Sequence, residues 1–280
     1  MSLELYHEVA SKTSALTTKN YSTSFYLSTT LLSPEMRDAI YAIYGFVRYA
    51  DEIVDSFHHQ NKAELMEEFE KEFYRSLERD LSMNPILHSF LRVVKRYNIK
   101  DEYIQAFLNS MKADLKEINY SNEEELKAYI YGSADVVGLM CLAVFCKGDT
   151  NLFADLEKPA MYLGSAFQKV NFLRDLKNDH ENLGRSYFPH VTRHNFTEES
   201  KAEIIADIEN DFNLAYKGIQ QLPSEAKPAV LLAYYYYRSL LNKLRRTPAS
   251  RIKVERIRVG SMKKIMLMNK AIVYNHLGLI

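Results

Sequence analysis

The sequence is poor in the residues that β-rich and disulfide-stabilised proteins use. Its 280 residues include only nine glycines and seven prolines, so a fold with many tight turns is disfavoured. Its two cysteines, Cys141 and Cys146, lie in an apolar stretch and match no disulfide or metal-binding pattern, which is typical of core thiols in a reducing compartment. The chain has no net charge, with 36 basic and 36 acidic side chains, so a general nucleic-acid-binding protein is not expected.

Long apolar runs and targeting signals are scarce as well. The first 20 residues are mixed and polar, unlike a signal peptide. The most apolar window, residues 128–146, contains Asp135 and predicts a buried core helix, because a membrane span needs about 20 mostly apolar residues. We therefore expect a cytoplasmic protein.

The charges are unevenly distributed near the C-terminus. Residues 238–270 contain eleven lysines and arginines and one acid, Glu255. Such a segment could meet phosphates or an anionic membrane surface, where each basic side chain adds about 1 kcal/mol of binding free energy. Peripheral contact with the inner face of a membrane is therefore one expectation for this segment.

Helical periodicity dominates the sequence, and no stretch shows the alternation of a β-strand. Ser33 and Pro34 predict the cap and first turn of a helix that runs to Val54. The polar stretches between a first helix and this one, "TTKNYSTS" and "LSTTLLS", are expected to be irregular. Short connections predict one all-α domain over residues 1–280, a bundle of about ten helices. The other predicted helices span residues 3–17, 61–81, 84–98, 100–118, 121–146, 156–184, 197–221, 224–246 and 250–275.

The stretch "FVRYADEIVD", residues 46–55, ends an apolar helix in acids. Asp51 and Asp55 are four residues apart and therefore share one helix face, on which Arg48 and Tyr44 also lie. Paired carboxylates suit Mg²⁺, whose remaining ligands are commonly water and substrate phosphates. Taken alone, however, such a pair is more often part of a solvated helix end.

A second helix carries a matching polar stripe. In "QKVNFLRDLKND" the polar residues Gln168, Asn171, Asp175 and Asp179 follow one another at helical spacing, and their neighbours are largely apolar. Buried polar groups need partners, and buried charges must be paired or must bind a metal. Two such helices facing each other across a bundle would form a metal and phosphate site.

Five segments together resemble the head-to-head trans-prenyl synthases, the family of squalene, dehydrosqualene and phytoene synthases. The resemblance covers most of the chain and implies an isoprenoid-synthase helical bundle with a central cavity between two Asp-rich helices. The segments are "STSFYLSTTLLSPEMRDAIYAIYGFVRYADEIVD", "YIYGSADVVGLM", "LGSAFQKVNFLRDLKNDHENLGRSYFP", "LPSEAKPAVLLAYYYYRSLLNKL" and "RIKVERIR".

The resemblance implies a role for particular side chains. The implied ligands of Mg²⁺, with Mn²⁺ as an alternative, are Asp51, Asp55, Asn171, Asp175 and Asp179. Contacts to the diphosphates, direct or through water, are implied for Arg48, Gln168, Arg174 and Arg251. The segment closing over one substrate contains Ser22, Ser24 and Phe25, and the tyrosines near the reacting centre are Tyr44, Tyr129 and Tyr237.

The implied reaction joins two allylic prenyl diphosphates through a cyclopropylcarbinyl diphosphate. Two geranylgeranyl diphosphates would give phytoene; two farnesyl diphosphates would give squalene, which needs NADPH, or dehydrosqualene. A class I terpene cyclase and a non-catalytic assembly factor of the same fold are the alternatives, although the acids of both motifs favour catalysis. Asp135 departs from the family pattern, and is either a satisfied polar residue or a proton relay facing the cavity.

Overall fold

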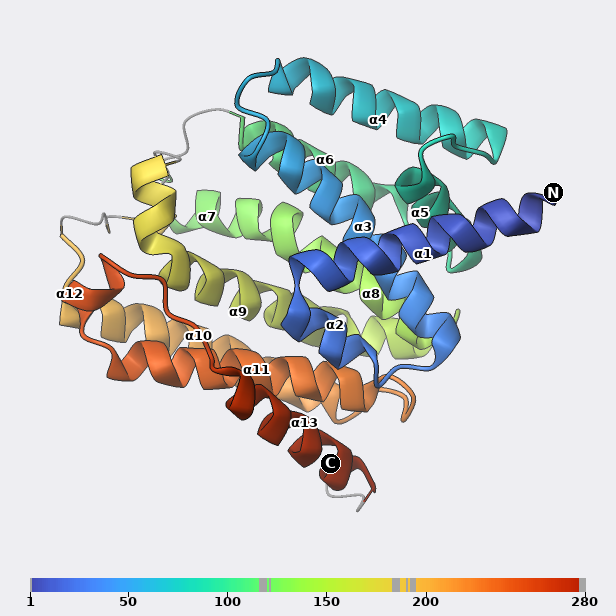
Figure 1. Ribbon diagram of the computed structural model, residues 1–280. Coiled ribbons are helices and arrows are strands. Elements are labelled where there is room, and N and C mark those ends of the chain that lie inside the picture. Colours follow the sequence, from blue (N-terminus) through green and yellow to red (C-terminus); the bar gives the residue numbers. More distant parts are fainter. Residues whose placement is uncertain are drawn as a thin grey trace.

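The helices of the chain stack around α3, α8 and α9 (Figure 1). The computed structural model describes residues 2–115, 120, 122–182, 187–189, 191 and 195–276, with the side chains of 178–182, 261 and 274–276 excepted. Within these ranges every regular element is a helix, which confirms the all-α prediction. The elements are α1 (Leu3–Tyr21), α2 (Thr23–Thr29), α3 (Pro34–Asp55), α4 (Lys62–Arg79), α5 (Pro85–Arg96), α6 (Asp101–Ala113), α7 (Glu123–Ile130), the π-helix η1 (Tyr131–Asp135), α8 (Val136–Cys146), α9 (Thr150–Asn182), α10 (Glu198–Ile219), α11 (Lys227–Arg246), α12 (Ala249–Ile252) and α13 (Ser261–His276).

One face of α3 is locked into an aromatic core. Phe46 is fully buried, and its ring lies 4.0 Å from that of Phe90 and 5.3 Å from that of Phe73, measured between centroids. Phe69 and Phe107 pack against the same ring at 5.4 and 5.7 Å. Aromatic pairs at these separations add stabilisation beyond their buried area. This packing fixes the rotation of α3 and therefore the direction in which its polar face points.

The long helix α9 packs against α10, α8, η1 and α11. Two glycines allow these close approaches. A Cβ at Gly164 on α9 would lie 2.9 Å from the carbonyl oxygen of Ala134, and a Cβ at Gly218 on α10 would lie 2.2 Å from Cβ of Pro159. Both distances are shorter than van der Waals contact permits. Glycine at these points therefore lets η1 and α10 hold α9 closely.

The helical stretch 123–146 is, by length and composition, apolar enough to cross a membrane. In the structure 61% of its most apolar window is buried, and α8 packs against α3, α6 and α9. This is the packing that the predicted core helix requires. The π-helix η1 interrupts the stretch, which the sequence analysis did not predict.

Two boundaries differ from the predictions near the termini. The polar stretch after residue 17 is helical: α1 continues to Tyr21 and α2 begins at Thr23. Within this helix the hydroxyl groups of Thr17 and Thr18 find partners by donating to the carbonyl oxygens of Thr13 and Ser14. Ser33 precedes Pro34 as expected, but its side chain makes no capping hydrogen bond.

The predicted helix 250–275 is instead two helices joined by a non-helical segment, residues 253–260, here called the strap. Its Ile257 is 4% exposed and so anchors it in the core. Lys243 Nζ on α11 donates to the carbonyl oxygen of Arg258 at 2.7 Å. These tertiary contacts hold the backbone away from a helical path.

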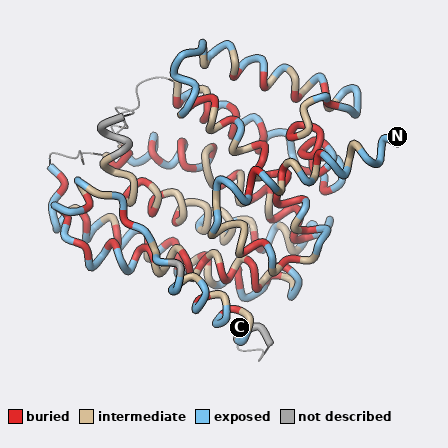
Figure 2. Tube along the Cα trace, in the orientation of Figure 1, coloured by how far each residue is buried: buried red, intermediate tan, exposed pale blue. Residues whose placement is uncertain are grey.

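Buried residues lie on the facing sides of the helices, and α4 at the edge of the bundle turns an exposed side outward (Figure 2). One principal hydrophobic cluster runs from α3 to α12. A smaller one joins α11 to α13 through Leu232, Tyr236, Leu267 and Ala271. α13 therefore contacts the rest of the protein mainly through α11.

Candidate functional site

The polar end of α3 forms one half of the candidate site. The guanidinium of Arg48 forms an ion pair with Glu52, lies 4.0 Å from Asp51 Oδ2, and stacks over the ring of Tyr21 with 4.4 Å between Cζ and the ring centroid. Arg48 Nε is buried and has no hydrogen-bond partner in the described part of the chain. A buried N–H without a partner is unfavourable, so it favours binding of an acceptor such as a phosphate oxygen. Asp55 lies half-buried one turn beyond Asp51.

The second half lies on α9 and is built around Asp175. This carboxylate is 17% exposed and receives the guanidinium of its neighbour Arg174, with Nε 3.1 Å from both oxygens and Nη2 2.5 Å from Oδ2. Arg256, from the strap, also reaches it, with Nε 2.7 Å from Oδ1 and Nη2 3.3 Å from Oδ2. Asp175 is thus held by two arginines, one local and one distant in sequence.

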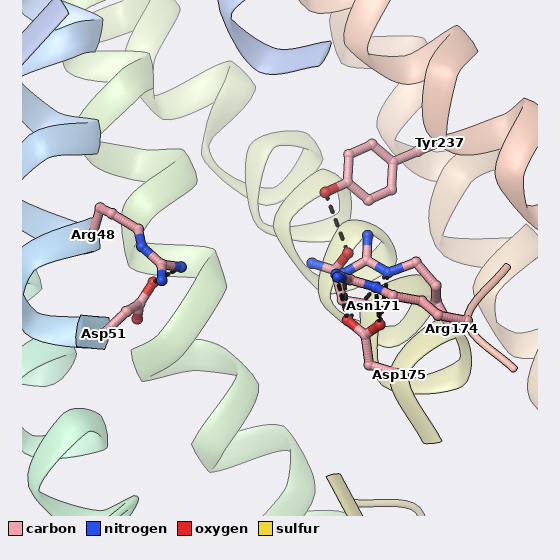
Figure 3. Close-up of polar contacts among 7 residues, drawn as sticks. Arg48, Asp51, Asn171, Arg174, Asp175 and Tyr237 are labelled. Atoms are coloured by element: carbon pink, nitrogen blue, oxygen red, sulfur yellow. Dashed lines mark hydrogen bonds and ion pairs between the residues drawn. The ribbon is translucent and has the colours of Figure 1, made fainter. Parts of the chain in front are cut away.

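The two halves point toward each other. Figure 3 shows Arg48 and Asp51 projecting from α3 toward the cluster of Asn171, Arg174 and Asp175 on α9. Gln168 lies half-buried one turn before Asn171 on α9. The side chain of Asp179, the last acid of the predicted stripe, lies outside the described residues.

Tyrosines and a phenylalanine surround the space between the halves. Tyr237 on α11 donates its hydroxyl to Asn171 Oδ1 at 3.4 Å, and its ring stacks on Phe167 at 3.9 Å between centroids. Burial raises the pKa of Tyr44 to about 12, with Arg48 opposing this effect and Asp51 and Tyr237 adding to it. Tyr44 therefore remains a neutral hydroxyl at physiological pH.

The segment predicted to close over a substrate lies beside α3. Ser22 caps α2 by accepting a hydrogen bond from the backbone N–H of Phe25 at 3.4 Å. The ring of Phe25 stacks on that of Tyr44 at 5.1 Å. Ser24 lies in the first turn of α2 and is half-buried. The break between α1 and α2 therefore directs Phe25 at the α3 half of the site.

Tyr129 occupies a different environment from Tyr44 and Tyr237. It is 7% exposed and donates its hydroxyl to Asp114 Oδ2 at 2.9 Å. Its ring packs against Tyr120, Phe172 and Tyr187. Burial, with Asp114 adding to it, raises the pKa of Tyr129 well above its ordinary value. The structure thus brings two of the three predicted tyrosines together and pairs the third with Asp114.

Arg251, which the resemblance implies as a diphosphate contact, lies on α12. Arg251 has a side chain that is 64% exposed and forms an ion pair with Glu255 on its own segment. Arg256, which the sequence analysis did not single out, is the strap residue that contacts Asp175. The sequence signals for it were the basic segment and the stretch "RIKVERIR", but a helical extrapolation through residues 250–275 gives the wrong side-chain directions.

The oxygen ligands of the two halves suit a hard cation such as Mg²⁺. Among the described side chains, no three from His, Cys, Asp and Glu lie close enough together to hold a metal ion by themselves. The carboxylates are instead divided between α3 and α9 and are accompanied by arginines. Such a donor set fits a cation whose shell is completed by oxygen atoms of a bound anion.

Outside the candidate site, α9 also carries Lys169, a buried lysine that forms ion pairs with α10. Lys169 Nζ lies 2.5 Å from Asp207 and 2.8 Å from Asp211, both on α10. Ser165 donates its hydroxyl to Oδ1 of Asp135 at 2.8 Å. Burial raises the pKa of Asp135 to about 7, while Ser165 and Lys169 oppose and Asp211 supports this shift. Asp135 is therefore a satisfied polar residue; a relay function for it stays a prediction.

The fold is shared with solved structures that differ widely in sequence. A dehydrosqualene synthase crystallised in complex with a ligand superposes with a TM-score of 0.81 over 96% of this chain and 97% of its own, at 23% identity. The squalene synthase HpnC from Alicyclobacillus acidocaldarius superposes with a TM-score of 0.75 over 88% of this chain and 96% of its own, at 18% identity. The chain thus has the all-α isoprenoid-synthase fold.

Sequence similarity extends this result to the family. The family model described as squalene/phytoene synthase matches residues 18–262, and the chain belongs to that family. The 15-cis-phytoene synthase of Synechococcus elongatus is 29% identical over 252 residues, which cover 80% of each protein. Phytoene synthase 1, chloroplastic, of Arabidopsis thaliana is 28% identical over 268 residues, or 88% of this chain. The chain covers less than two thirds of the length of this relative, at 62%, and of phytoene synthase 3, chloroplastic, of Zea mays, at 63%.

Proposed function

We propose that the protein condenses two allylic prenyl diphosphates head-to-head through a cyclopropylcarbinyl diphosphate intermediate. The observation that carries this proposal is the opposition of two polar half-sites on α3 and α9, with Tyr237 bonded to Asn171 beside them (Figure 3). The family assignment supports the same reaction class. Each diphosphate would lie between an arginine and carboxylates that approach from opposite helices.

Charge complementarity supports the assignment of the diphosphate site. Arg48 offers a buried N–H that has no partner among the described residues, and Arg174 and Arg256 supply further positive charge opposite it. Asp51, Asp55, Asn171 and Asp175 would hold Mg²⁺, or Mn²⁺ in its place. The bound cation would stabilise the negative charge that develops on the departing diphosphate. Arg48 would orient the same anion through charge-assisted hydrogen bonds.

The aromatic side chains beside the half-sites would protect the carbocation. Phe25 and Tyr44 stack on the α3 side, and Phe167 and Tyr237 stack on the α9 side. An aromatic face near a cation contributes about 0.5 to 2 kcal/mol, and the packed rings also exclude water. Because the pKa of Tyr44 is about 12, its hydroxyl would remain neutral and would not trap the cation as a phenolate.

Phytoene from two geranylgeranyl diphosphates is the product we favour. Relatives named phytoene synthase, in cyanobacteria and plants, support this choice. Squalene or dehydrosqualene from two farnesyl diphosphates is the second candidate, and squalene alone would require NADPH. The solved structures with the same fold bear those names, but at 23% identity or less they argue for the fold only.

The test is to incubate the purified protein with each diphosphate, with and without Mg²⁺ and NADPH, and to identify the extracted hydrocarbon by mass spectrometry. We expect a C40 hydrocarbon from geranylgeranyl diphosphate that requires Mg²⁺ and is independent of NADPH. A cyclised product from a single diphosphate would identify a terpene cyclase. No release of diphosphate under any condition would favour the non-catalytic assembly factor.

We also propose that the protein is cytoplasmic and contacts membranes peripherally, because its substrates and product would be lipids. The outer side of α13 supports this location. Met262, Ile265 and Met266 are 82%, 51% and 53% exposed and form one row at helical spacing, next to the exposed Lys263. A helix with apolar and basic side chains on its outer surface is suited to an anionic bilayer.

A further inference from the structure

Two histidines join α1 to α5 outside the candidate site. Nδ1 of His7 on α1 lies 2.7 Å from Nε2 of His88 on α5, and the two rings stack with 4.9 Å between their centroids. His88 is fully buried, and its Nδ1 accepts the backbone N–H of Ser82 at 3.4 Å. Tyr6, beside His7, donates its hydroxyl to the carbonyl oxygen of Ser82 at 2.7 Å. The start of α1 is thus attached to α5 and to the connection before it, residues 80–84.

The hydrogen bonds of this histidine pair define where its protons lie. A backbone N–H can only donate, so Nδ1 of His88 carries no proton. In a neutral imidazole the proton is then on Nε2, which donates to Nδ1 of His7. A further proton on either ring must therefore bind at Nδ1. There it would face the N–H of His88 in one case and the N–H of Ser82 in the other, so a hydrogen bond would be replaced by two opposed donors.

The surroundings of the pair also disfavour a positive charge. Burial lowers the pKa of both histidines below the ordinary value of 6.5; Arg92 acts in the same direction on each, and Asp80 opposes it. A group whose pKa is lowered in the folded state contributes stability above its ordinary pKa and loses this contribution as the pH falls through its lowered pKa. The titratable groups around the pair are Glu4 and Tyr6 of α1, Glu72 of α4, Asp80, Arg92 of α5 and, one turn further along α1 at Ser11, Asp38 of α3.

We propose that the histidine pair is an acid-sensitive attachment, which holds α1 to α5 while both rings are neutral and releases it when either ring takes up a proton. This inference goes beyond the proposed function and does not depend on it. Its consequence reaches the candidate site, because α1 ends at Tyr21, whose ring lies against the guanidinium of Arg48. Phe25 follows on α2 and stacks on Tyr44. Acid should therefore loosen the side of the site that α1 and α2 cover.

The test is hydrogen–deuterium exchange of the full chain, followed by mass spectrometry, at about pH 7.5 and about pH 5.5, with protection factors corrected for the intrinsic rate. Each histidine that takes up a proton only when α1 opens raises the opening equilibrium about tenfold one pH unit below 6.5. We expect the protection of the α1 amides, residues 3–21, to fall by about tenfold if one ring takes up a proton on opening, and by about a hundredfold if both do. The amides of α8 should not lose protection, because the release is local.

The double variant His7→Asn/His88→Gln removes both titrating rings. Asn supplies an acceptor oxygen on α1, and the Gln amide offers one acceptor and one donor, as a neutral imidazole does. Its α1 protection should agree at the two pH values within about twofold, whatever its absolute level. His7→Asn alone leaves one titrating ring and should show a smaller fall than wild type, which keeps the test valid if the double variant does not fold.

His59→Asn is the matched control, because it replaces an exposed histidine that follows α3. Its α1 protection should fall with acid as in wild type. The proposal is overturned if wild-type α1 protection does not depend on pH, or if the double variant keeps the wild-type dependence. It is also overturned if the amides of α1 and α8 lose protection together, since acid would then act on the whole fold.

Discussion

The polar ends of α3 and α9 carry similar side chains but hold them in different ways. On α3 the charges are local: Arg48 pairs with Glu52 one turn along the same helix, and Asp51 lies 4.0 Å from the same guanidinium. On α9 the acid Asp175 depends on Arg256, 81 residues away in sequence. The ion pair of Arg48 on α3 thus follows from helical spacing, whereas Asp175 on α9 also depends on a tertiary contact. Substitutions in the two halves should differ in their effect on stability more than in their effect on activity.

The largest expected effect is on turnover, and it should be similar in the two halves. Asp51→Asn and Asp175→Asn should each lower kcat by about 10² to 10³ or more, because each removes charge that stabilises the departing diphosphate. The two variants should differ in stability. Asp51→Asn should change the free energy of unfolding by less than about 0.5 kcal/mol. Asp175→Asn should lower it by about 1 to 2 kcal/mol, because two guanidiniums lose their partner.

Steady-state kinetics and urea unfolding measure these effects. The control is Glu67→Gln, which changes an exposed carboxylate on α4. It should alter neither kcat nor the free energy of unfolding. Equal stability losses in Asp51→Asn and Asp175→Asn would remove the distinction between the local and the tertiary half. Near-normal turnover in either variant would exclude that residue from the site.

The charges on the rear side of α9 should affect stability strongly. Lys169→Met should lower the free energy of unfolding by about 3 kcal/mol, because Asp211, whose side chain is 8% exposed, is left buried without its ion pair. The double variant Lys169→Met/Asp211→Leu should recover most of this loss, since it replaces the pair with apolar groups. Denaturant unfolding measures both. A full loss that persists in the double variant would contradict the assignment.

Asp135 on η1, which is bonded to Ser165 of α9, should make the stability of the protein depend on pH. Its pKa in the folded protein is raised from 3.8 to about 7, so its stabilising contribution is complete below about pH 4 and is lost as the pH rises through 7. Asp135→Asn, which stays neutral, should therefore be more stable than wild type at pH 8 by about 2 kcal/mol or more. The gain should shrink at pH 5. Urea midpoints at both pH values test this, and an equal loss of stability at both would show that the carboxylate is ionised and paired.

The smallest effect concerns α13, which follows the strap that completes the α9 half. Lys263→Gln should weaken co-sedimentation with anionic phospholipid vesicles about fivefold, which corresponds to about 1 kcal/mol for one basic side chain near the surface. Lys71→Gln, at an exposed position on α4, should have no effect. Binding that depends on neither salt nor anionic lipid would exclude this surface as a docking site.

Sequence reasoning was most successful where the spacing within one helix decides the outcome. The alignment of Tyr44, Arg48 and Asp51 on α3, and of Asn171 with Asp175 on α9, follows from 3.6 residues per turn. Sequence reasoning was also sufficient to predict the all-α class, because apolar periodicity runs through most of the chain. That the two acidic helices point toward each other was inferred from buried polarity together with the family resemblance.

The features that sequence reasoning missed depend on tertiary packing, which no local sequence pattern encodes. The strap departs from a helical path because Ile257 and the Lys243 contact hold it, and its Arg256 contacts Asp175. The hydroxyl of Tyr129 on α7 is bonded to Asp114, which caps the C-terminus of α6. No sequence pattern singled out Asp114. The helical end of α1 and helix α2 were missed because their serine and threonine residues carry little apolar periodicity, although hydroxyls such as those of Thr17 and Thr18 find partners within the helix.

The distance in sequence between Asp175 and Arg256 has a consequence during translation. A ribosome adding roughly 5 to 20 residues per second needs about 4 to 16 s to cover the 81 residues that separate them. Throughout that interval the nascent chain already contains both acidic helices, but Asp175 has only Arg174 beside it. Until the strap emerges, the growing polypeptide would present a less neutralised carboxylate to cellular Mg²⁺ than the finished protein does.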